Sequence, residues 1–177
     1  MLQETGLPYE TKIISKHDRG EEGGNLSAIT PAGTFPAIVD TDTGATVFES
    51  AAVLYYLADK AGKLLPSNSR DKADVMKWLL FEAANICPVI LEIHHYIMND
   101  TGDLPGSILE RYQSMLVNFC EILEKQLNER EFLAGELSIA DIALHPWMVT
   151  LQDMADININ EYPNLSRWAV SINKRYE

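Results

Sequence analysis

The change of hydrophobic pattern along the chain is the feature that most constrains its fold. Short apolar runs of the strand type occur before Ser50, whereas the apolar patterns after Asp71 have helical spacing. A β-containing segment followed by a helical segment fits two domains with separate cores. We therefore expect a small α/β domain at residues 1–62, a linker at 63–70 and an all-α domain at 71–177.

The N-terminal segment contains three β-prone runs and one helical pattern. Residues 9–15 (YETKIIS) form the first run, and PAIVDTDTGATVFES contains two more, separated by DTDTG, which is typical of a hairpin turn. Residues 50–61 have apolar side chains at helical spacing and are followed by Gly62, the residue that a helix C-terminus favours. The predicted order is strand, loop, strand, turn, strand and helix.

Helical patterns fill the C-terminal segment. Residues 71–98 are apolar almost all round and contain Pro88, so we expect a central buried helix kinked near this proline. A long amphipathic helix is predicted from one stripe of apolar side chains, which comprises Ile108, Tyr112, Met115, Phe119, Leu123 and Leu127. The last helix is predicted to bury another stripe, which comprises Leu165, Trp168, Ala169, Ile172 and Tyr176.

Two of these helices begin with the pattern of a capping box. Ser107 with Glu110, and Ser138 with Asp141, place a hydroxyl three residues before a carboxylate. In a capping box, these side chains satisfy backbone N–H groups that the first helical turn leaves unpaired. Asp141 also has the chemistry of an acid catalyst, but the cap is the better interpretation. Its replacement should therefore damage folding before it damages any chemistry.

Composition and charge exclude several classes of protein. The chain has 177 residues, of which 46% are hydrophobic and 23% charged, as expected for a soluble globular protein. No apolar run approaches the ~20 residues that cross a bilayer, and the first residues lack the pattern of a signal peptide. We therefore expect a cytoplasmic protein. The formal net charge of −12 argues against nucleic acid as a partner.

The cysteines and histidines do not form a metal-binding or redox motif. Cys87 and Cys120 fall within helical patterns and not in a CxxC sequence, so we expect two buried thiols. His94 and His95 are adjacent, and adjacent side chains on a helix point in different directions. A structural or pocket-lining role is expected for these histidines, and no metal site is predicted.

Several separated motifs resemble the glutathione transferase family. TFPAIVD at 34–40 is similar to its proline segment, VFESAAVLYYLADK at 47–60 to its Glu-Ser helix, and FLAGELSIADIALHPWM at 132–148 to its capping-box helix. The pieces IHHY, ERYQ and HPW most resemble the bacterial nu class, which includes glutathione-dependent disulfide reductases. The resemblance covers nearly the whole chain. It implies a thioredoxin-like N-terminal domain, an all-helical C-terminal domain and a homodimer.

The resemblance also implies a glutathione site. Pro36 corresponds to a cis proline of the family, and the backbone of Phe35 would pair with the cysteinyl part of glutathione. Ser50, at a helix start that attracts anions, would bind the γ-glutamyl carboxylate, and Glu49 the ammonium group. Arg111 would reach the glycyl carboxylate. The alternatives are that Ser50 is an ordinary N-cap and Glu49 an ordinary acid of the first turn, and that Arg111 is a solvated arginine on a helix.

One part of the family pattern has no counterpart. The family's sheet begins with a strand, followed by a loop whose Tyr, Ser, Thr or Asn lowers the pKa of the glutathione thiol. The opening LQETGLPYE instead resembles the end of the first helix and the loop after it. The predicted thioredoxin-like domain is therefore incomplete, and the catalytic residue stays unassigned.

Different functions remain open at this point. In the leading hypothesis, glutathione is a cosubstrate whose thiolate attacks an electrophile or exchanges with a disulfide. The alternative is a non-catalytic binding or regulatory module that keeps the helical domain. A third possibility is an incomplete gene product without native activity.

Overall fold

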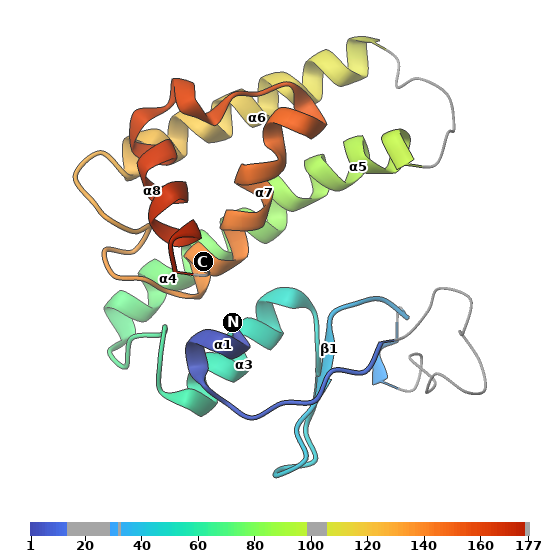
Figure 1. Ribbon diagram of the computed structural model, residues 1–177, viewed down its shortest axis with the longest axis vertical. Coiled ribbons are helices and arrows are strands. Elements are labelled where there is room, and N and C mark those ends of the chain that lie inside the picture. The colour runs from blue at the N-terminus through green and yellow to red at the C-terminus, as the bar shows by residue number, and fades with distance from the viewer. Residues whose placement is uncertain (14–28, 32, 99–105, 176–177) are drawn as a thin grey trace. The chain divides into compact units, whose positions relative to one another are not determined.

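The computed structural model describes residues 1–13, 29–31, 33–98 and 106–175, which form the compact units Met1–Leu65 and Pro66–Glu177 (Figure 1). The elements of the N-terminal unit are α1 Leu2–Thr5, β1 Ala37–Val39, β2 Thr46–Phe48 and α3 Ser50–Ala61. Those of the C-terminal unit are α4 Ser69–Phe81, the π-helical turn η1 Glu82–Ile86, α5 Cys87–Met98, α6 Gly106–Gln126, α7 Ile139–Ala155, the 3-10 turn η2 Ile159–Glu161 and α8 Pro163–Asn173. The predicted combination of an α/β segment and a helical segment is confirmed.

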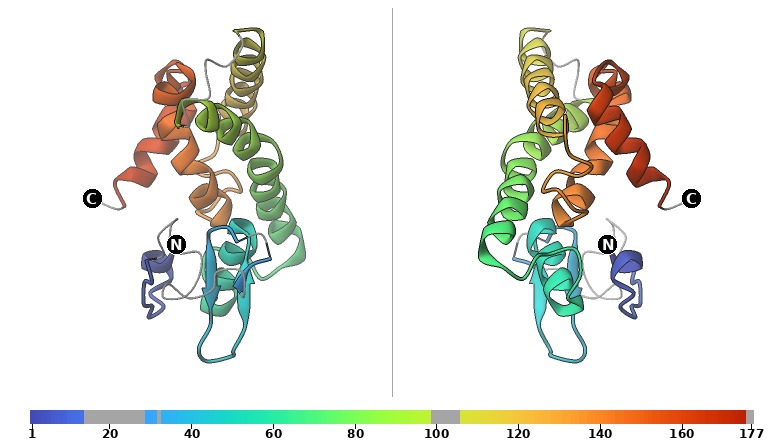
Figure 2. Two further views of the ribbon diagram at one scale, coloured as in Figure 1. Left: turned by 90° about the vertical axis from the view of Figure 1, so that its right-hand side faces the viewer. Right: turned by 90° about the vertical axis from the view of Figure 1, so that its left-hand side faces the viewer.

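The hairpin predicted in the N-terminal unit is present. Strands β1 and β2 pair antiparallel, with Ala37 opposite Phe48 and Val39 opposite Thr46. The turn is closed by backbone hydrogen bonds of Asp40 with Ala45 at 2.8 Å and with Gly44 at 2.7 Å. Gly44 has φ of 73°, a left-handed conformation that glycine adopts without a steric penalty. The turn forms a narrow projection from this unit (Figure 2).

The hairpin turn is held against α3 by a carboxylate. Asp40 is 8% exposed, and it accepts hydrogen bonds from Lys60 at 2.7 Å and from the hydroxyl of Tyr56. These two donors, the lysine first, hold the pKa of Asp40 well below its usual range. Lys60 also bonds to the exposed Asp42 at 2.8 Å. The turn and the C-terminal half of α3 are therefore joined by charge-assisted hydrogen bonds.

Helix α3 has the bounds that the sequence predicted. It buries Val53, Leu57 and Ala58, and it ends where Gly62 adopts φ of 63°. Packing against both strands and α1 gives the helix a buried face. This agreement is expected, because both the apolar stripe and the glycine stop are local signals.

The β-prone run at residues 9–15 was predicted wrongly over its described part. Residues 9–13 belong to no strand, and Ile13 is 90% exposed. Residues 14 and 15 lie outside the described residues. A β-prone run becomes a strand only when another strand pairs with it. Among the residues that the structure describes, the sheet consists of β1 and β2.

The single helix predicted over residues 71–98 is divided by the π-helical turn η1. The N–H of Cys87 bonds to the carbonyl of Glu82, five residues earlier, and Pro88 follows directly. Proline has no N–H and crowds the carbonyl four residues before it, so the regular α-helical bonding pattern is interrupted here. The expected burial all round was wrong, because Leu80 and Leu91 are 53% and 48% exposed.

Helix α6 shows which part of its predicted stripe is buried. Leu116, Phe119, Cys120 and Leu123 are buried, whereas Ile108 is 38% exposed. The predicted cap at Ser107 was wrong, because the helix already begins at Gly106 and Ser107 lies within its first turn. The stripe therefore contributes to the core mainly through the C-terminal half of α6.

Asp141 connects three parts of the helical unit. Its carboxylate is 0% exposed and accepts hydrogen bonds from Leu133 N at 2.9 Å, Ser138 N at 3.0 Å, Ser138 Oγ at 2.9 Å and Trp168 Nε1 at 2.9 Å. Burial raises the pKa of Asp141, and these donors act in the opposite direction. The predicted capping box at Ser138 and Asp141 is confirmed. The carboxylate is a structural acceptor.

Helix α8 completes the helical core. It buries Leu165, Trp168, Ala169 and Ile172, as predicted, and Tyr176 lies outside the described residues. Its start is capped by Glu124 of α6, which accepts hydrogen bonds from Asn164 N and Leu165 N, each at 2.9 Å. This cap from another helix fixes the position of α8 against α6.

The cysteines differ in their surroundings. Cys120 is 0% exposed, and burial raises its pKa to about 12. Cys87 is only partly buried, and burial raises its pKa as well. The prediction of buried thiols is thus correct for Cys120 and incomplete for Cys87. None of the helices in the described part combines the length and apolar composition that spanning a membrane requires.

Replacing Asp141 by alanine should destabilise the helical unit strongly. The N–H groups of Leu133, Ser138 and Trp168 would lose their acceptor, and each unpaired buried donor costs roughly 1–3 kcal/mol. We expect a loss of at least about 3 kcal/mol in the free energy of unfolding, measured by urea denaturation with circular dichroism. The control Asp153→Ala, at an exposed position of the same helix, should change it by less than about 0.5 kcal/mol. Equal effects of the two substitutions would contradict this role.

Asp40 should make the stability of the N-terminal unit depend on pH in the acidic range. A carboxyl whose pKa is lowered on folding stabilises the folded state above its ordinary pKa of 3.8 and loses this contribution as the pH falls below it. The stability advantage of the wild type over Asp40→Asn should therefore be constant near neutral pH and shrink below pH 3.8. Thermal unfolding across this range measures it. The control is Asp42→Asn, which removes an exposed partner of the same lysine. If the stability advantage of the wild type over Asp40→Asn stayed the same below pH 3.8, this would count against the proposed role of the Asp40 hydrogen bonds.

Candidate functional site

The candidate site is built around one end of the hairpin. Because Ala37 pairs with Phe48, the residues that flank this pair, Pro36 and Glu49, lie at the same end of the two strands. The Phe35–Pro36 peptide bond is cis, as predicted. Phe35 is 57% exposed, so the hairpin end presents an aromatic ring to its surroundings. The hairpin thus brings together the pair Phe35 and Pro36 before β1 and the pair Glu49 and Ser50 after β2.

Glu49 has an unusual backbone conformation. It stands between β2 and α3 with φ of 70° and ψ of 125°, and a residue with a side chain seldom adopts such a positive φ. Conformations of this kind cost about 1–3 kcal/mol and occur preferentially at functional sites. The sequence carries no signal for it, because glutamate is not a residue associated with left-handed backbone.

The first turn of α3 has no side-chain cap. The first helical bond runs from Val53 N to Glu49 O at 2.9 Å, so the N–H groups of Ser50, Ala51 and Ala52 have no acceptor within the helix. The alternative that Ser50 is an ordinary N-cap is wrong, since Ser50 is the first helical residue and its side chain makes no cap bond. Three N–H groups, an exposed hydroxyl and the positive end of a helix form a site suited to a carboxylate.

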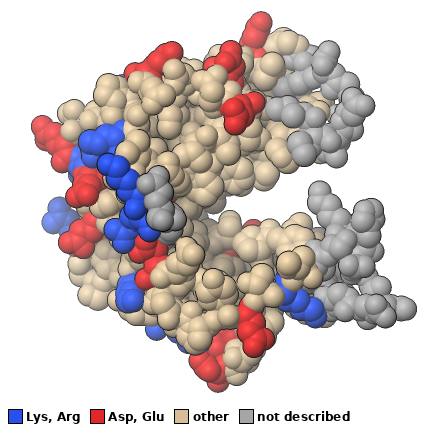
Figure 3. Space-filling model, viewed as in Figure 1, with Lys and Arg blue, Asp and Glu red and all other residues tan. Residues whose placement is uncertain are grey.

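The negative charge of the chain makes the uncapped start of α3 important for anion binding. The formal net charge is −12, and Figure 3 shows acidic side chains on both units of the face drawn. A field of this sign repels small anions at a distance. Binding of an anion therefore depends on local hydrogen-bond donors such as those at the start of α3.

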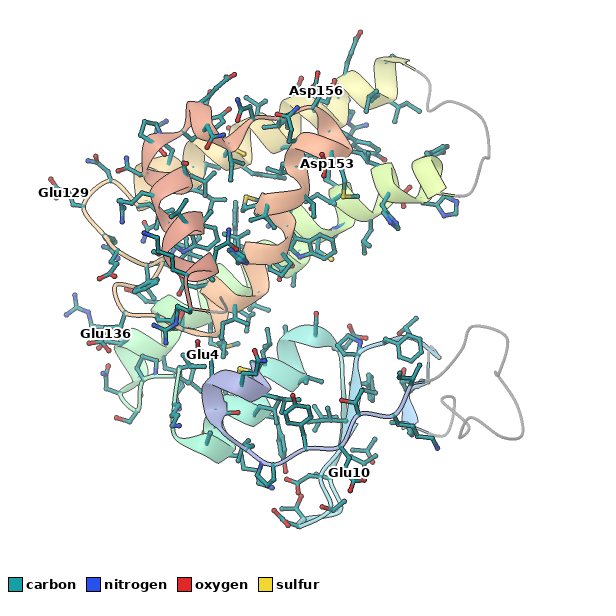
Figure 4. The ribbon with its side chains drawn as sticks, viewed as in Figure 1. Glu4, Glu10, Glu129, Glu136, Asp153 and Asp156 are labelled. Carbon is teal, nitrogen blue, oxygen red and sulfur yellow. The ribbon has the colours of Figure 1, made fainter. Side chains whose placement is uncertain are left out.

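The remaining candidate residues lie in the helical unit. Arg111 is on α6 and its side chain is exposed. His94 and His95 are exposed on α5, where the ring of His95 lies 5.8 Å from that of Tyr96, edge to face. The acidic residues labelled in Figure 4 are distributed over α1, the segment after it, the α6–α7 loop and the end of α7. Across the described ranges, no group of three His, Cys, Asp or Glu side chains is placed to hold a metal ion.

Comparison with known proteins identifies relatives of the whole chain. Residues 1–60 match the family model described as glutathione S-transferase, N-terminal domain. The chain is 33% identical over 180 residues to the disulfide-bond oxidoreductase YfcG of Escherichia coli strain K12, covering 98% of this chain and 83% of that protein. It is 31% identical to a glutathione S-transferase domain-containing protein of Dictyostelium discoideum, covering 96% of this chain and 68% of that protein.

Solved structures show the same similarity. A glutathione transferase family member from Pseudomonas fluorescens, crystallised with two glutathione molecules, has a TM-score of 0.84 and 29% identity, covering 96% of this chain and 79% of that one. A glutathione transferase from Pseudomonas putida, with one glutathione disulfide bound per subunit, has a TM-score of 0.84 and 25% identity, covering 96% and 78%. The resemblance inferred from the sequence motifs is confirmed.

Replacing Glu49 by glycine should stabilise the chain, because glycine adopts a positive φ without the steric cost that glutamate carries. We expect a gain of about 0.5–1 kcal/mol in the free energy of unfolding, measured by urea denaturation, after subtraction of the entropy that glycine loses on folding. The matched control is Glu121→Gly at an exposed position of α6, which should lose about 1 kcal/mol. A loss of similar size at both positions would show that the backbone at Glu49 is unstrained.

Proposed function

Because the chain belongs to the glutathione S-transferase family, we propose that it binds glutathione at the hairpin end and uses the glutathione thiol on a disulfide or another electrophile. The observation that carries the proposal is the register of β1 and β2, which sets Pro36 beside Glu49 at the uncapped start of α3. The relatives named as disulfide-bond oxidoreductases, and the related structures with bound glutathione, support it.

The proposed contacts follow from the charges of glutathione. Its γ-glutamyl carboxylate would accept hydrogen bonds from the hydroxyl of Ser50 and from the N–H groups of the first turn of α3. Glu49 would pair with the ammonium group, and the backbone of Phe35, before the cis Pro36, would pair with the cysteinyl residue. Arg111 would bind the glycyl carboxylate, since a guanidinium group forms two parallel hydrogen bonds with a carboxylate.

The reaction proposed is thiol–disulfide exchange through glutathione. The glutathione thiolate attacks one sulfur of the disulfide substrate, forms a mixed disulfide and releases the other sulfur as a thiolate, which takes up a proton. A second glutathione thiolate then attacks the glutathione sulfur of the mixed disulfide, which gives glutathione disulfide and the second substrate thiol. The protein's own cysteines are poorly suited to this role, because burial raises the pKa of both Cys87 and Cys120. The residue that lowers the pKa of the bound thiol is unassigned.

A non-catalytic binding module is the second candidate function. It is favoured by the small sheet of the described residues, which consists of β1 and β2. For either function we propose a homodimer in the cytoplasm. The exposed apolar side chains of Leu80 and Leu91 support an interface, and two free cysteines are compatible with a reducing compartment.

Replacing Ser50 by alanine should weaken glutathione binding by about tenfold or more, because one hydrogen bond to a charged group is worth roughly 1.5–3 kcal/mol. Isothermal titration calorimetry with reduced glutathione measures the dissociation constant. Ser69→Ala is the matched control, since Ser69 is the exposed first residue of α4. Equal dissociation constants for the wild type and Ser50→Ala would contradict the site.

Turnover separates the two candidate functions. With reduced glutathione and hydroxyethyl disulfide, an enzyme should produce glutathione disulfide at a rate that Ser50→Ala lowers. Binding of glutathione without turnover would favour the non-catalytic module.

A further inference from the structure

Glu82 is a buried carboxyl group that the proposed function does not use. It is the first residue of η1, in the turn that separates α4 from α5, and it is 4% exposed. Trp147 of α7 donates a hydrogen bond from Nε1 to Oε1 of Glu82 at 2.6 Å. The turn η1 also packs against α4, α5 and α7. An acidic side chain therefore lies at a junction of three helices.

The environment of Glu82 contrasts with that of Asp141. Asp141 receives four hydrogen bonds from N–H and O–H donors, which together suit an ionised carboxylate. Among the hydrogen bonds of the described residues, the carboxyl of Glu82 receives one, from the neutral indole of Trp147. A buried carboxylate with so little compensation is unfavourable, whereas a protonated carboxyl is tolerated. Burial raises the pKa of both acids, and they differ in how many donors compensate it, four for Asp141 and one for Glu82.

The charged groups around Glu82 do not supply the missing compensation. On α4, Asp74 and Lys77 pair with each other at 2.7 Å. On α7, burial lowers the pKa of His145, which interacts with Ala169 and Asn173 of α8. On α5, the pKa of Cys87 is raised by burial and further by the charge of Glu82. No ion pair of Glu82 occurs among the described residues.

We propose that Glu82 is a pH-sensitive packing contact, which allows η1 to pack closely against α7 when it is protonated and loosens this packing when it ionises. The physical reason is that an ionised carboxyl needs water or charged donors, and at this position it can obtain them only if the packing of η1 opens. The π-helical turn is a suitable place for such a change, because its backbone bonding is already irregular.

The direction of the pH effect follows from burial. Burial raises the pKa of Glu82 from 4.5 to about 7, against a smaller opposite effect of the Trp147 hydrogen bond. A group whose pKa is raised on folding contributes stability that is fully present below its unfolded pKa and is lost as the pH rises through the folded pKa. The helical unit should therefore lose stability as the pH rises from mildly acidic to mildly alkaline values.

The first test compares the full-length wild type with Glu82→Gln in urea unfolding. Glutamine keeps an oxygen acceptor for Trp147 but cannot ionise. The ratio of the unfolding equilibrium constants of wild type and variant should rise by roughly tenfold or more between about pH 5 and about pH 8. Glu92→Gln, an exposed position on α5, is the matched control and should leave this pH dependence unchanged. A wild-type-to-Glu82→Gln ratio that is constant with pH overturns the proposal.

The second test follows the titration of the wild type itself. The indole N–H signal of Trp147 in proton–nitrogen NMR spectra of the wild type, identified by its loss in Trp147→Phe, should shift with pH with a midpoint near the pKa of about 7. If Glu82→Gln folds, its Trp147 signal should not titrate in this range. A wild-type signal that stays constant, or one that titrates with a midpoint near the ordinary glutamate pKa of 4.5, overturns the proposal.

Discussion

Every helix start presents backbone N–H groups that need acceptors, and this requirement organises much of the structure. Asn68 accepts from Asp71 N at 2.9 Å at the start of α4, and Asp141 does the same for α7 at 3.0 Å. At the start of α8 the acceptor is Glu124, which comes from another helix. Helix α3 is the exception among these four, because its first turn has no side-chain cap. Among these four helices, the uncapped N–H groups thus lie at α3, beside the residues that the family resemblance assigned to glutathione.

The two buried acids of the helical unit show that burial alone does not decide what a carboxyl group does. Asp141 has enough donors to be a fixed structural acceptor, and its donors come from the α6–α7 loop, including the N-cap residue Ser138, and from α8. Glu82 is nearly as inaccessible, but the turn it occupies offers it one indole donor. The two carboxyl groups therefore differ in the number of hydrogen-bond donors much more than in their depth of burial.

Sequence reasoning succeeded where the cause is local. The hairpin, the bounds of α3 and the capping box at Ser138 and Asp141 all depend on residues close together in the chain. It failed where the cause is long-range: the run at residues 9–15 lacks a described partner strand, and the exposure of Leu80 and Leu91 depends on which neighbours cover each helix face. A glutamate within an otherwise apolar helical run was a visible signal for Glu82, but its burial required the packing of η1.

In the candidate site, the sequence motifs predicted the residue types and the cis proline. The structure added the strand register that brings Pro36 and Glu49 to one end of the hairpin. The positive φ of Glu49 and the absence of a cap at Ser50 have no sequence signature, because each is set by how β2 passes into α3. The binding roles of Phe35, Pro36, Glu49, Ser50 and Arg111 remain proposals.

The bonds of Asp40 to α3 have a further mechanical consequence. Strand β2 runs directly into α3 at Glu49, and the hairpin turn before that strand is fastened to the far half of the same helix by Lys60 and Tyr56. The turn, β2 and α3 are therefore connected at both ends, by the chain at Glu49 and by the hydrogen bonds of Asp40. None of the three can move relative to the others without breaking a hydrogen bond to this carboxylate. The donors at the corner near Ser50 are thereby held in place before any ligand arrives.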